Sequence, residues 1–546
     1  MLNKTKKSMK SEEGTVKKDI MPKDAHENFM GGPSYDLSPF ARLYVMASST
    51  FFGENAYYGD VRCKSSSEDT LSHLEKAFGS FGFIMRQLMS GKTRADAMRK
   101  AIEDSLEYDA ELTLRFFEWL RTKALVRATP AVGLAIASRS EKVRGSDMLR
   151  SVSKNILSRL DDVTNCLSYY LANYGKPIPN GLKKALAERL VSAKEYELAK
   201  YAGKKKDVTM QDVIRLTHAH SSAIDKFYKG ELSQAVEGLE TWEAIISEEG
   251  STKEAWTKAI GVMGHMALLR NLRNFGKVGI DEDLYLDKLV AGAKTGKQLP
   301  FRYFSAWQNV KSSKVKKALE QCLDISIENL PKLPGRSLIL VDNSGSAIGA
   351  TVSNMSNVNV ATCGNLMGIL TGLISDSGKI GVFGDKIKYI PINKGFSGTA
   401  LEMLETVNGI GETVGQATEN GIWLALDDAI SSKEKFDRIF IYSDMQAGHG
   451  GLYGIDPIRY PRWKNKGRYI DVPMLMAEYR NKVNPFCKLY SVQIGGYSDN
   501  VFPEFYPDTC ILSGWSPELL KFVVMFEKNP ASIEDVFRKE FGLEKK

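Results

Sequence analysis

One short loop in the last third of the chain gathers oxygen-bearing side chains that suit a hard cation. Asp342, Ser344 and Ser346 occupy alternate positions, as D-x-S-x-S, at the end of the apolar run RSLILVD (336–342). Mg²⁺ takes oxygen ligands in octahedral geometry and keeps some of its waters. A tight loop with alternate oxygen side chains can present three ligands to one point. The spacing therefore predicts a divalent-cation site, with Mg²⁺ as the best fit.

A second apolar run, RIFIYSD (438–444), also ends in an aspartate, Asp444. In doubly wound sheets the ligand sites lie at the carboxyl ends of the strands, so Asp444 is expected to face the same loop. Thr418, in GQATENG, is a further candidate ligand, and Thr413, in GIGETVG, competes with it. The alternative is a serine-rich turn that only caps a helix.

This set of residues, in this order, resembles the metal-ion-dependent adhesion site of von Willebrand A domains. The resemblance implies a cation with one open position that a partner carboxylate can fill. We therefore expect a docking or structural metal and no hydrolase. A metal-dependent protein-adhesion module without an RNA role is the alternative function for the whole chain.

The elements that must position these residues alternate between strand and helix. Strands are expected at 336–342, 438–444 and 487–494 and as a pair within 379–392; helices are expected at 358–374, 400–408, 418–430, 472–483 and 516–526, the last with Ser516 as N-cap and Pro517 at its first position. Alternation of this kind predicts an α/β, mostly parallel, doubly wound (Rossmann-like) domain over residues 333–546.

The preceding region follows a different pattern. Residues 36–332 show apolar side chains at three- and four-residue spacing, as in 68–91, 93–109 and 111–124, with short turns between. This is typical of stacked helical hairpins of the HEAT type and predicts an all-α helical-repeat domain. Residues 1–35 are polar and lysine-rich at their start and are expected to be disordered.

Basic residues cluster within the helical region. The candidates for contact with RNA phosphates are Lys183, Lys184, Arg189, Lys200, Lys204, Lys205 and Arg215, with His218 nearby in RLTHAH. Clustering of this kind is what phosphate neutralisation requires. The alternative is a solvated helix face whose lysines pair with Glu188, Glu195 and Glu197. Arg270 and Arg273 stand three apart in ALLRNLRN and are candidates for a second RNA-contacting helix.

Five segments in order carry a second resemblance: 40–60, 182–201, 212–220, 264–277 and 299–307. Together with the following A-type domain they resemble the TROVE module of the Ro ribonucleoprotein autoantigen family, in its bacterial form. The resemblance implies a ring of HEAT-like repeats that binds small noncoding Y RNAs on its outer surface, with His218 as one contact. It also implies that single-stranded 3′ ends of misfolded RNAs enter the central hole. A ribonuclease tethered through RNA is an implied partner, in noncoding RNA quality control.

Other features narrow the function class. The chain has 546 residues, 43% hydrophobic and 26% charged, with a net charge of +8, which permits a nucleic-acid partner without demonstrating one. Its six cysteines form no C-x-x-C pair, and no run of eighteen apolar residues or secretory signal is evident. We expect a cytoplasmic, monomeric binding protein and no enzyme, since phosphate-loop and H-E-x-x-H motifs are missing. A nuclease using the metal is the enzymatic alternative.

Overall fold

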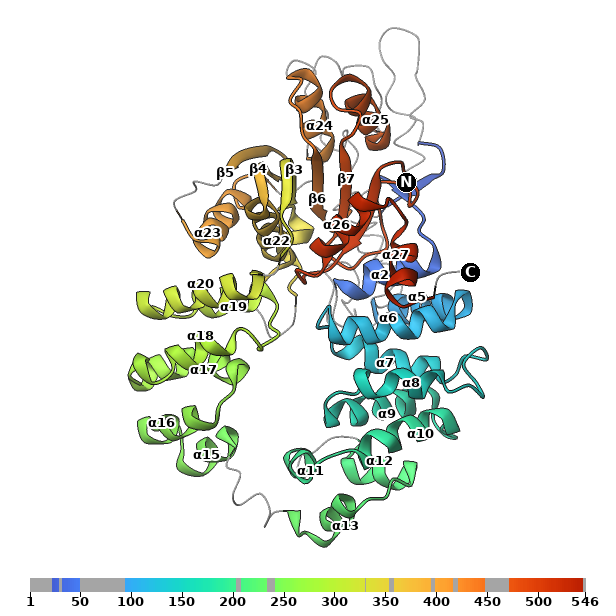
Figure 1. Ribbon diagram of the computed structural model, residues 1–546, viewed down its shortest axis with the longest axis vertical. Coiled ribbons are helices and arrows are strands. Elements are labelled where there is room, and N and C mark those ends of the chain that lie inside the picture. Colours follow the sequence, from blue (N-terminus) through green and yellow to red (C-terminus); the bar gives the residue numbers. More distant parts are fainter. Residues whose placement is uncertain are drawn as a thin grey trace, which may run out of the picture.

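The computed structural model describes residues 22–28, 32–49, 94–202, 208–232, 241–328, 330–352, 358–393, 398–415, 421–446 and 471–543. Its helical region consists of two stacks that are joined in sequence through residues 233–240 (Figure 1). The first stack comprises α5 (Arg94–Tyr108), α6 (Ala110–Thr122), α7 (Ala128–Ala137), α8 (Met148–Ile156), α9 (Leu160–Tyr174), α10 (Asn180–Val191), α11 (Glu195–Ala202), α12 (Met210–Thr217) and α13 (Ser222–Lys229). The second comprises α15 (Trp242–Glu249), α16 (Lys253–Val262), α17 (His265–Val278), a 3-10 turn (Glu282–Leu284), α18 (Leu286–Gly292), α19 (Pro300–Gln308) and α20 (Ser313–Ile327).

Helical hairpins pack in two rows within the first stack. One row runs from α6 to α8, α10 and α12, and the other from α7 to α9 and α11 and on to α13. Local signals start these helices: Asp109 caps α6, and Thr209 and Asp212 form a reciprocal capping box at α12. The helical-repeat prediction is confirmed. The predicted segment 68–91 lies outside the described residues.

The C-terminal domain is a six-stranded sheet of order β5-β4-β3-β6-β7-β8, parallel except for the edge strand β5. Its strands are β3 (Leu333–Asp342), β4 (Ser375–Phe383), β5 (Ile387–Asn393), β6 (Arg438–Ser443), β7 (Lys488–Gln493) and β8 (Thr509–Ser513). Its helices are α21 (Gly345–Gly349), α22 (Val360–Ile374), α23 (Ala400–Gly411), α24 (Ile422–Ser431), α25 (Val472–Lys482), α26 (Leu519–Lys528) and α27 (Ile533–Glu540). The doubly wound fold predicted from the sequence is confirmed.

Glycines at four-residue spacing bring α22 close to the sheet. A Cβ added at Gly364 would lie 2.5 Å from a side-chain carbon of Ile494, and one at Gly368 would lie 2.6 Å from Val341. Larger residues would therefore push the helix off the strands. This close approach places Asn365, which lies between them, next to the loop after β3.

Several elements differ from the sequence prediction. Strand β8 and helix α27 were not predicted, and α26 begins at Leu519 because Ser516 and Pro517 form a tight turn before it. Within the segment expected to be disordered, Ala25–Glu27 (β1) and Pro33–Tyr35 (β2) form a small antiparallel sheet. The backbone N–H of Tyr35 donates to the carbonyl of Asn500 at 3.0 Å, so this hairpin is held by the C-terminal domain.

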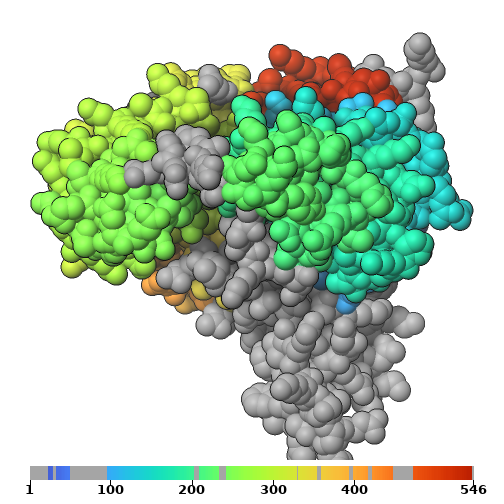
Figure 2. All heavy atoms as spheres, turned by 90° about the horizontal axis from the view of Figure 1, so that it is seen from below, coloured from blue at the N-terminus to red at the C-terminus, as the bar shows by residue number. Residues whose placement is uncertain are grey.

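Both helical stacks attach to the sheet domain. On one side an aromatic group, the closure cluster, joins the first helices to the last; it consists of Phe40 and Tyr44 of α2 (Pro39–Ser48), Phe116 and Trp119 of α6, Phe522 of α26 and Phe537 of α27. On the other side Phe301 of α19 meets Trp515 edge-on at 5.9 Å. The sheet domain therefore bridges the two stacks. Figure 2 shows the two stacks from below. No helix among the described residues is long and apolar enough to cross a membrane.

We predict that Phe537→Ala destabilises the whole chain by about 3–5 kcal/mol, because it removes a fully buried ring from the closure cluster. Chemical denaturation followed by tryptophan fluorescence measures this loss. Phe486→Ala is the control, since Phe486 is 80% exposed and its loss should change stability by less than about 0.5 kcal/mol. Equal effects of the two substitutions would show that the cluster does not hold the chain ends together.

Candidate metal centre and nucleic-acid surface

The two predicted aspartates end neighbouring parallel strands. Asp342 ends β3 and Asp444 directly follows β6, and both side chains are buried. Ser443, one residue before Asp444, donates its hydroxyl to Asp342 Oδ2 at 2.5 Å. The carboxyl ends of β3 and β6 therefore bring both carboxylates to one place, as the strand pattern predicts.

The serines of the D-x-S-x-S loop complete the cluster. The backbone N–H of Ser344 donates to Asp342 Oδ1 at 2.9 Å, and the hydroxyls of Ser344 and Ser346 lie 3.1 Å apart. Ser346 also hydrogen-bonds the side chain of Asp444. Four of the five predicted metal ligands are thus assembled.

The fifth predicted ligand, Thr418, lies outside the described residues. Its competitor Thr413 accepts a hydrogen bond from Lys388 of β5 at 2.8 Å and donates its hydroxyl to the carbonyl of Ile410. These bonds hold Thr413 against the edge strand, two strands away from β3. Thr413 is therefore not part of the cluster.

Amides that the sequence analysis did not single out hold the loop in place. Asn343 and Asn365 exchange two side-chain hydrogen bonds, of 2.9 and 2.8 Å, and Asn365 also donates to Asn408 at 2.8 Å. On the other side Gln493 of β7 donates to the backbone carbonyl of Asp444 at 3.0 Å. The glycine spacing of α22 is the one sequence signal that could have pointed to Asn365.

The electrostatics of the cluster favour a bound cation. Burial and the neighbouring Asp342 raise the pKa of Asp444 to about 7, and burial likewise raises the pKa of Asp342. Among the described residues no basic side chain forms an ion pair with either carboxylate. Buried negative charge without a partner is unfavourable, and a divalent cation would offset it. The donor set, two carboxylates and two hydroxyls, fits a hard cation such as Mg²⁺.

The predicted RNA-contacting residues of the first stack fall on consecutive helices. Lys184 of α10, Lys200 of α11 and Arg215 of α12 are exposed, and Lys183 of α10 is half-buried. Within the described part of the chain, none of these four forms an ion pair. His218 follows α12 with an exposed side chain, and its backbone adopts the left-handed conformation (φ 55°). Lys204 and Lys205 lie outside the described residues.

Arg189 occupies a different environment. Its side chain is only 8% exposed; it donates to the carbonyl of Leu157 at 2.8 Å and to that of Ser158 at 3.3 Å, and it pairs with Glu197. These contacts tie α10 to the turn before α9. We therefore reassign Arg189 from the RNA-contacting set to the packing of the helical stack.

The glutamates that could have neutralised the basic face have other partners. Glu188 pairs with Arg150, and Glu195 pairs with Lys226 at 2.7 Å. Among the described residues, the candidate lysines Lys183, Lys184 and Lys200 therefore do not pair with these glutamates. In the second stack, Arg270 and Arg273 of α17 are both exposed, with Lys277 four residues further along.

Comparison with known proteins agrees with this architecture. Residues 234–332, from just before α15 to the end of the second stack, match the TROVE domain family. The likeness to the TROVE domain family thus covers this part of the chain. The fold is similar to that of the crystal structure of the Deinococcus radiodurans Ro (Rsr) protein, with a TM-score of 0.55, 15% sequence identity, and coverage of 90% of this chain and 99% of that one. No curated protein sequence matches the chain.

The resemblance to the Ro family is therefore confirmed in the TROVE match and in the fold. Of the five segments that carry it, 264–277 and 299–307 lie inside the matched TROVE region. The segments with the predicted Y RNA contacts, 182–201 and 212–220, lie in the first stack, which is covered by the structural likeness alone.

We predict that Mg²⁺ stabilises the protein and that its apparent affinity falls about tenfold for each pH unit below about pH 7, because protonated Asp444 must release a proton on binding. Without metal, the stability of the protein changes with pH in the opposite direction to the Mg²⁺ affinity. The folded-state pKa of Asp444 is raised, so its contribution to stability declines as pH rises from about 4 to about 7. Thermal unfolding in Mg²⁺ and in EDTA across this range measures both effects.

Asp342→Asn should abolish the Mg²⁺-dependent shift in melting temperature. Asp385→Asn is the matched control, because Asp385 follows the neighbouring strand β4 but lies outside the cluster. A Mg²⁺ effect that survives Asp342→Asn, or is lost equally in Asp385→Asn, would contradict this metal centre.

Proposed function

We propose that this protein binds small, structured noncoding RNA, of the Y RNA type, on the outer face of its first helical stack. The TROVE match and the Ro fold support an RNA-binding protein of the Ro type. We further propose that single-stranded 3′ ends of misfolded RNAs contact the second stack. In this proposal the protein acts in noncoding RNA quality control, or as an adaptor to which RNA tethers an exoribonuclease.

The observation that carries the proposal is the set of exposed cations on α10, α11 and α12 that form no ion pair among the described residues, although Arg215 lies near enough to Asp212 to lower the pKa of that carboxyl. Helix α12 packs against both α10 and α11, so Lys184, Lys200 and Arg215 are carried by helices in direct contact. Their charges are free of the neighbouring glutamates, as described above. Such an arrangement favours binding of a phosphate backbone, because each neutralised phosphate releases counterions.

His218 is suited to contact a base or ribose at the edge of this surface. A hydrogen bond from its backbone N–H to the carbonyl of Ile214 fixes its left-handed cap position, so the exposed imidazole projects from a rigid point. His220, by contrast, lies 3.3 Å from Asp225 and is the weaker candidate. A histidine ring can stack on or hydrogen-bond an unpaired base.

The second stack offers a separate cationic stripe. Met266, Arg270, Arg273 and Lys277 follow one another at helical spacing along α17, and all four are exposed. α17 faces the first stack across the molecule in Figure 1. Three exposed cations in one line can neutralise successive phosphates of a strand, which supports the proposed contact with RNA 3′ ends.

We predict that Lys183→Ala/Lys184→Ala/Arg215→Ala lowers affinity for a structured RNA about tenfold or more and reduces the slope of log affinity against log salt by about two to three. Electrophoretic mobility or fluorescence anisotropy over a salt series measures both. Lys253→Ala/Lys277→Ala/Lys258→Ala, which removes three charges from α16 and α17 of the other stack, is the control for charge removal, and its effect on a structured RNA should be smaller. Unchanged affinity in the triple variant would overturn the surface assignment.

The assembled Asp342, Ser344, Ser346 and Asp444 cluster keeps a second function open, metal-dependent capture of a protein partner. A carboxylate from the partner would occupy the open position of the cation. We propose that the cation serves this docking or structural purpose and not catalysis, because the cluster is a one-metal pattern, whereas metal-assisted phosphodiester cleavage commonly uses a metal pair.

We predict that Asp342→Ala leaves RNA affinity within about twofold of wild type, since the cluster lies in the sheet domain at the ends of β3 and β6 and shares no contact with α10–α12 among the described residues. The same variant should release any protein partner captured in Mg²⁺. End-labelled RNA incubated with the protein and Mg²⁺ should stay intact. Cleavage by the wild-type protein that disappears in Asp342→Ala would instead establish the nuclease alternative.

A further inference from the structure

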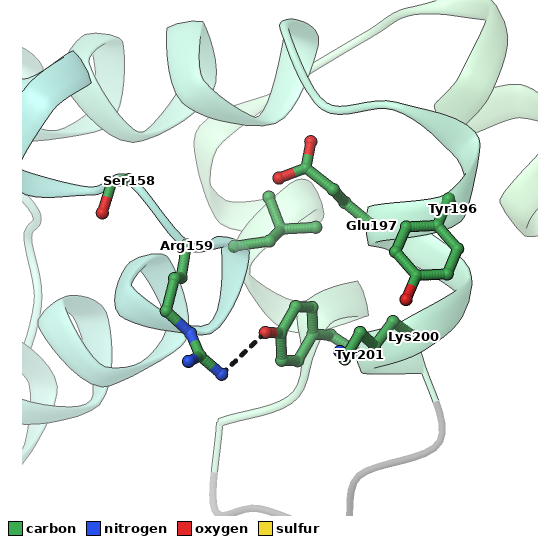
Figure 3. Close-up of a pocket in the computed structure, with 7 residues that line it drawn as sticks. Ser158, Arg159, Tyr196, Glu197, Lys200 and Tyr201 are labelled. Carbon is green, nitrogen blue, oxygen red and sulfur yellow. Dashed lines mark hydrogen bonds between the residues drawn. The ribbon is translucent and has the colours of Figure 1, made fainter. Parts of the chain in front are cut away.

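A small pocket opens between the start of α9 and α11 in the first stack. Its volume is about 250 Å³, and it is lined by Ser158, Arg159, Leu160, Tyr196, Glu197, Lys200 and Tyr201. Figure 3 shows Ser158 and Arg159 on one side of it and the α11 side chains on the other. It is smaller than the pockets of about 300–1,000 Å³ that enclose drug-sized ligands, and it suits one flat ring.

The pocket combines a rigid floor with an available aromatic face. Leu160 is fully buried beneath it. Arg159 donates to the hydroxyl of the buried Tyr201 at 3.0 Å, which fixes both side chains in position. Tyr196, on the same helix as Tyr201, is 37% exposed. Its ring is therefore the surface on which a second ring can stack.

The charges of the pocket favour an anionic ligand. Lys200 Nζ lies 5.9 Å from the centre of the Tyr196 ring, and in the described part of the chain it has no carboxylate partner. Glu197 would oppose an anion, but it is paired with Arg189 and accepts the backbone N–H of Lys194 at 3.1 Å. Among the described pocket residues, the cation without a carboxylate partner is Lys200, whose ammonium lies over one face of the Tyr196 ring and leaves the other face for stacking.

We propose that this pocket receives one unpaired base of a bound RNA, stacked on Tyr196, with the adjoining phosphate on Lys200. This inference rests on the proposed function, because Lys200, one of the cations assigned there to RNA, lines the pocket and α11 packs against α12. An aromatic face beside a cation is the combination that unpaired nucleotides bind, since every base has a π-face and carries a phosphate. The surface would thus recognise an irregularity in a structured RNA as well as its backbone.

The test uses the full-length protein and a short RNA duplex with a single unpaired 2-aminopurine, a fluorescent base whose emission drops when it stacks on an aromatic ring. Wild-type protein should quench this emission. Tyr196→Ala should lose the quenching and weaken binding by between about 5-fold and about 100-fold, the range for removing one base–aromatic stack. Tyr196→Phe should keep both, because it keeps the ring. Tyr228→Ala is the matched control, since Tyr228 is a 44% exposed tyrosine outside the pocket.

A second RNA, with an abasic nucleotide at the unpaired position, completes a double-mutant cycle between Tyr196 and the base. Removal of the base should lower the RNA affinity of the wild-type protein and leave the RNA affinity of Tyr196→Ala unchanged. Lys200→Met should keep the quenching and reduce the salt slope by about one.

Equal sensitivity of wild type and Tyr196→Ala to the abasic substitution would overturn the pocket, even if RNA binding itself is strong. Failure of the proposed function gives a different result, since the Lys183, Lys184 and Arg215 triple variant would then bind RNA as tightly as wild type.

Discussion

The architecture depends on one non-local contact, the closure cluster between the first and last helices of the described chain. Phe40 and Phe116 both meet Phe537 edge-on, at 5.6 and 5.5 Å. Joining segments so far apart costs loop-closure entropy, which burial of several large rings must exceed. Polar contacts join the same segments. The Ser38 hydroxyl donates to Glu504, 466 positions away, and Arg538 pairs with Asp109 at 2.8 Å. This contact joins the first stack directly to the sheet domain, in addition to its connection in sequence through the second stack.

The closure contact continues to the metal centre through hydrogen bonds. Tyr44 of the cluster accepts the backbone N–H of Ser513 at 3.0 Å, and the Ser513 hydroxyl donates to the carbonyl of Gln493 at 3.1 Å. Gln493 in turn holds the backbone of Asp444. A chain of contacts is not in itself allosteric coupling. What it does establish is that α2 helps to fix Asp444 from one side, while Asn343 and Asn365 fix the Asp342 loop from the other.

Features that depend on local periodicity and on where strands end could be predicted from the sequence. The burial of a side chain against residues far away in the chain could not. Two apolar strands ending in aspartate were enough to place Asp342 and Asp444 together. Arg189 was misassigned on charge alone, although it falls in step with Leu182 and Leu186 on the buried face of α10 and helical spacing could have excluded it. The pairing of Glu188 with Arg150 on another helix, by contrast, cannot be inferred from the sequence around Glu188. The pocket at Tyr196 arises from two helices that only the fold brings together.

The positions of the two sites bear on how they can act. The metal cluster lies at the carboxyl edge of the sheet, whereas α10 to α13 lie at the far end of the first stack (Figure 1). The charges at the two ends are opposite in sign, with buried carboxylates at one and exposed lysines at the other. At this distance surface charges are screened from each other at physiological salt. On the proposed assignments, an RNA on the helical face and a carboxylate-bearing partner on a bound cation can be held at the same time. The first stack and its closure contact with the sheet domain would then set the spacing between the two proposed ligands.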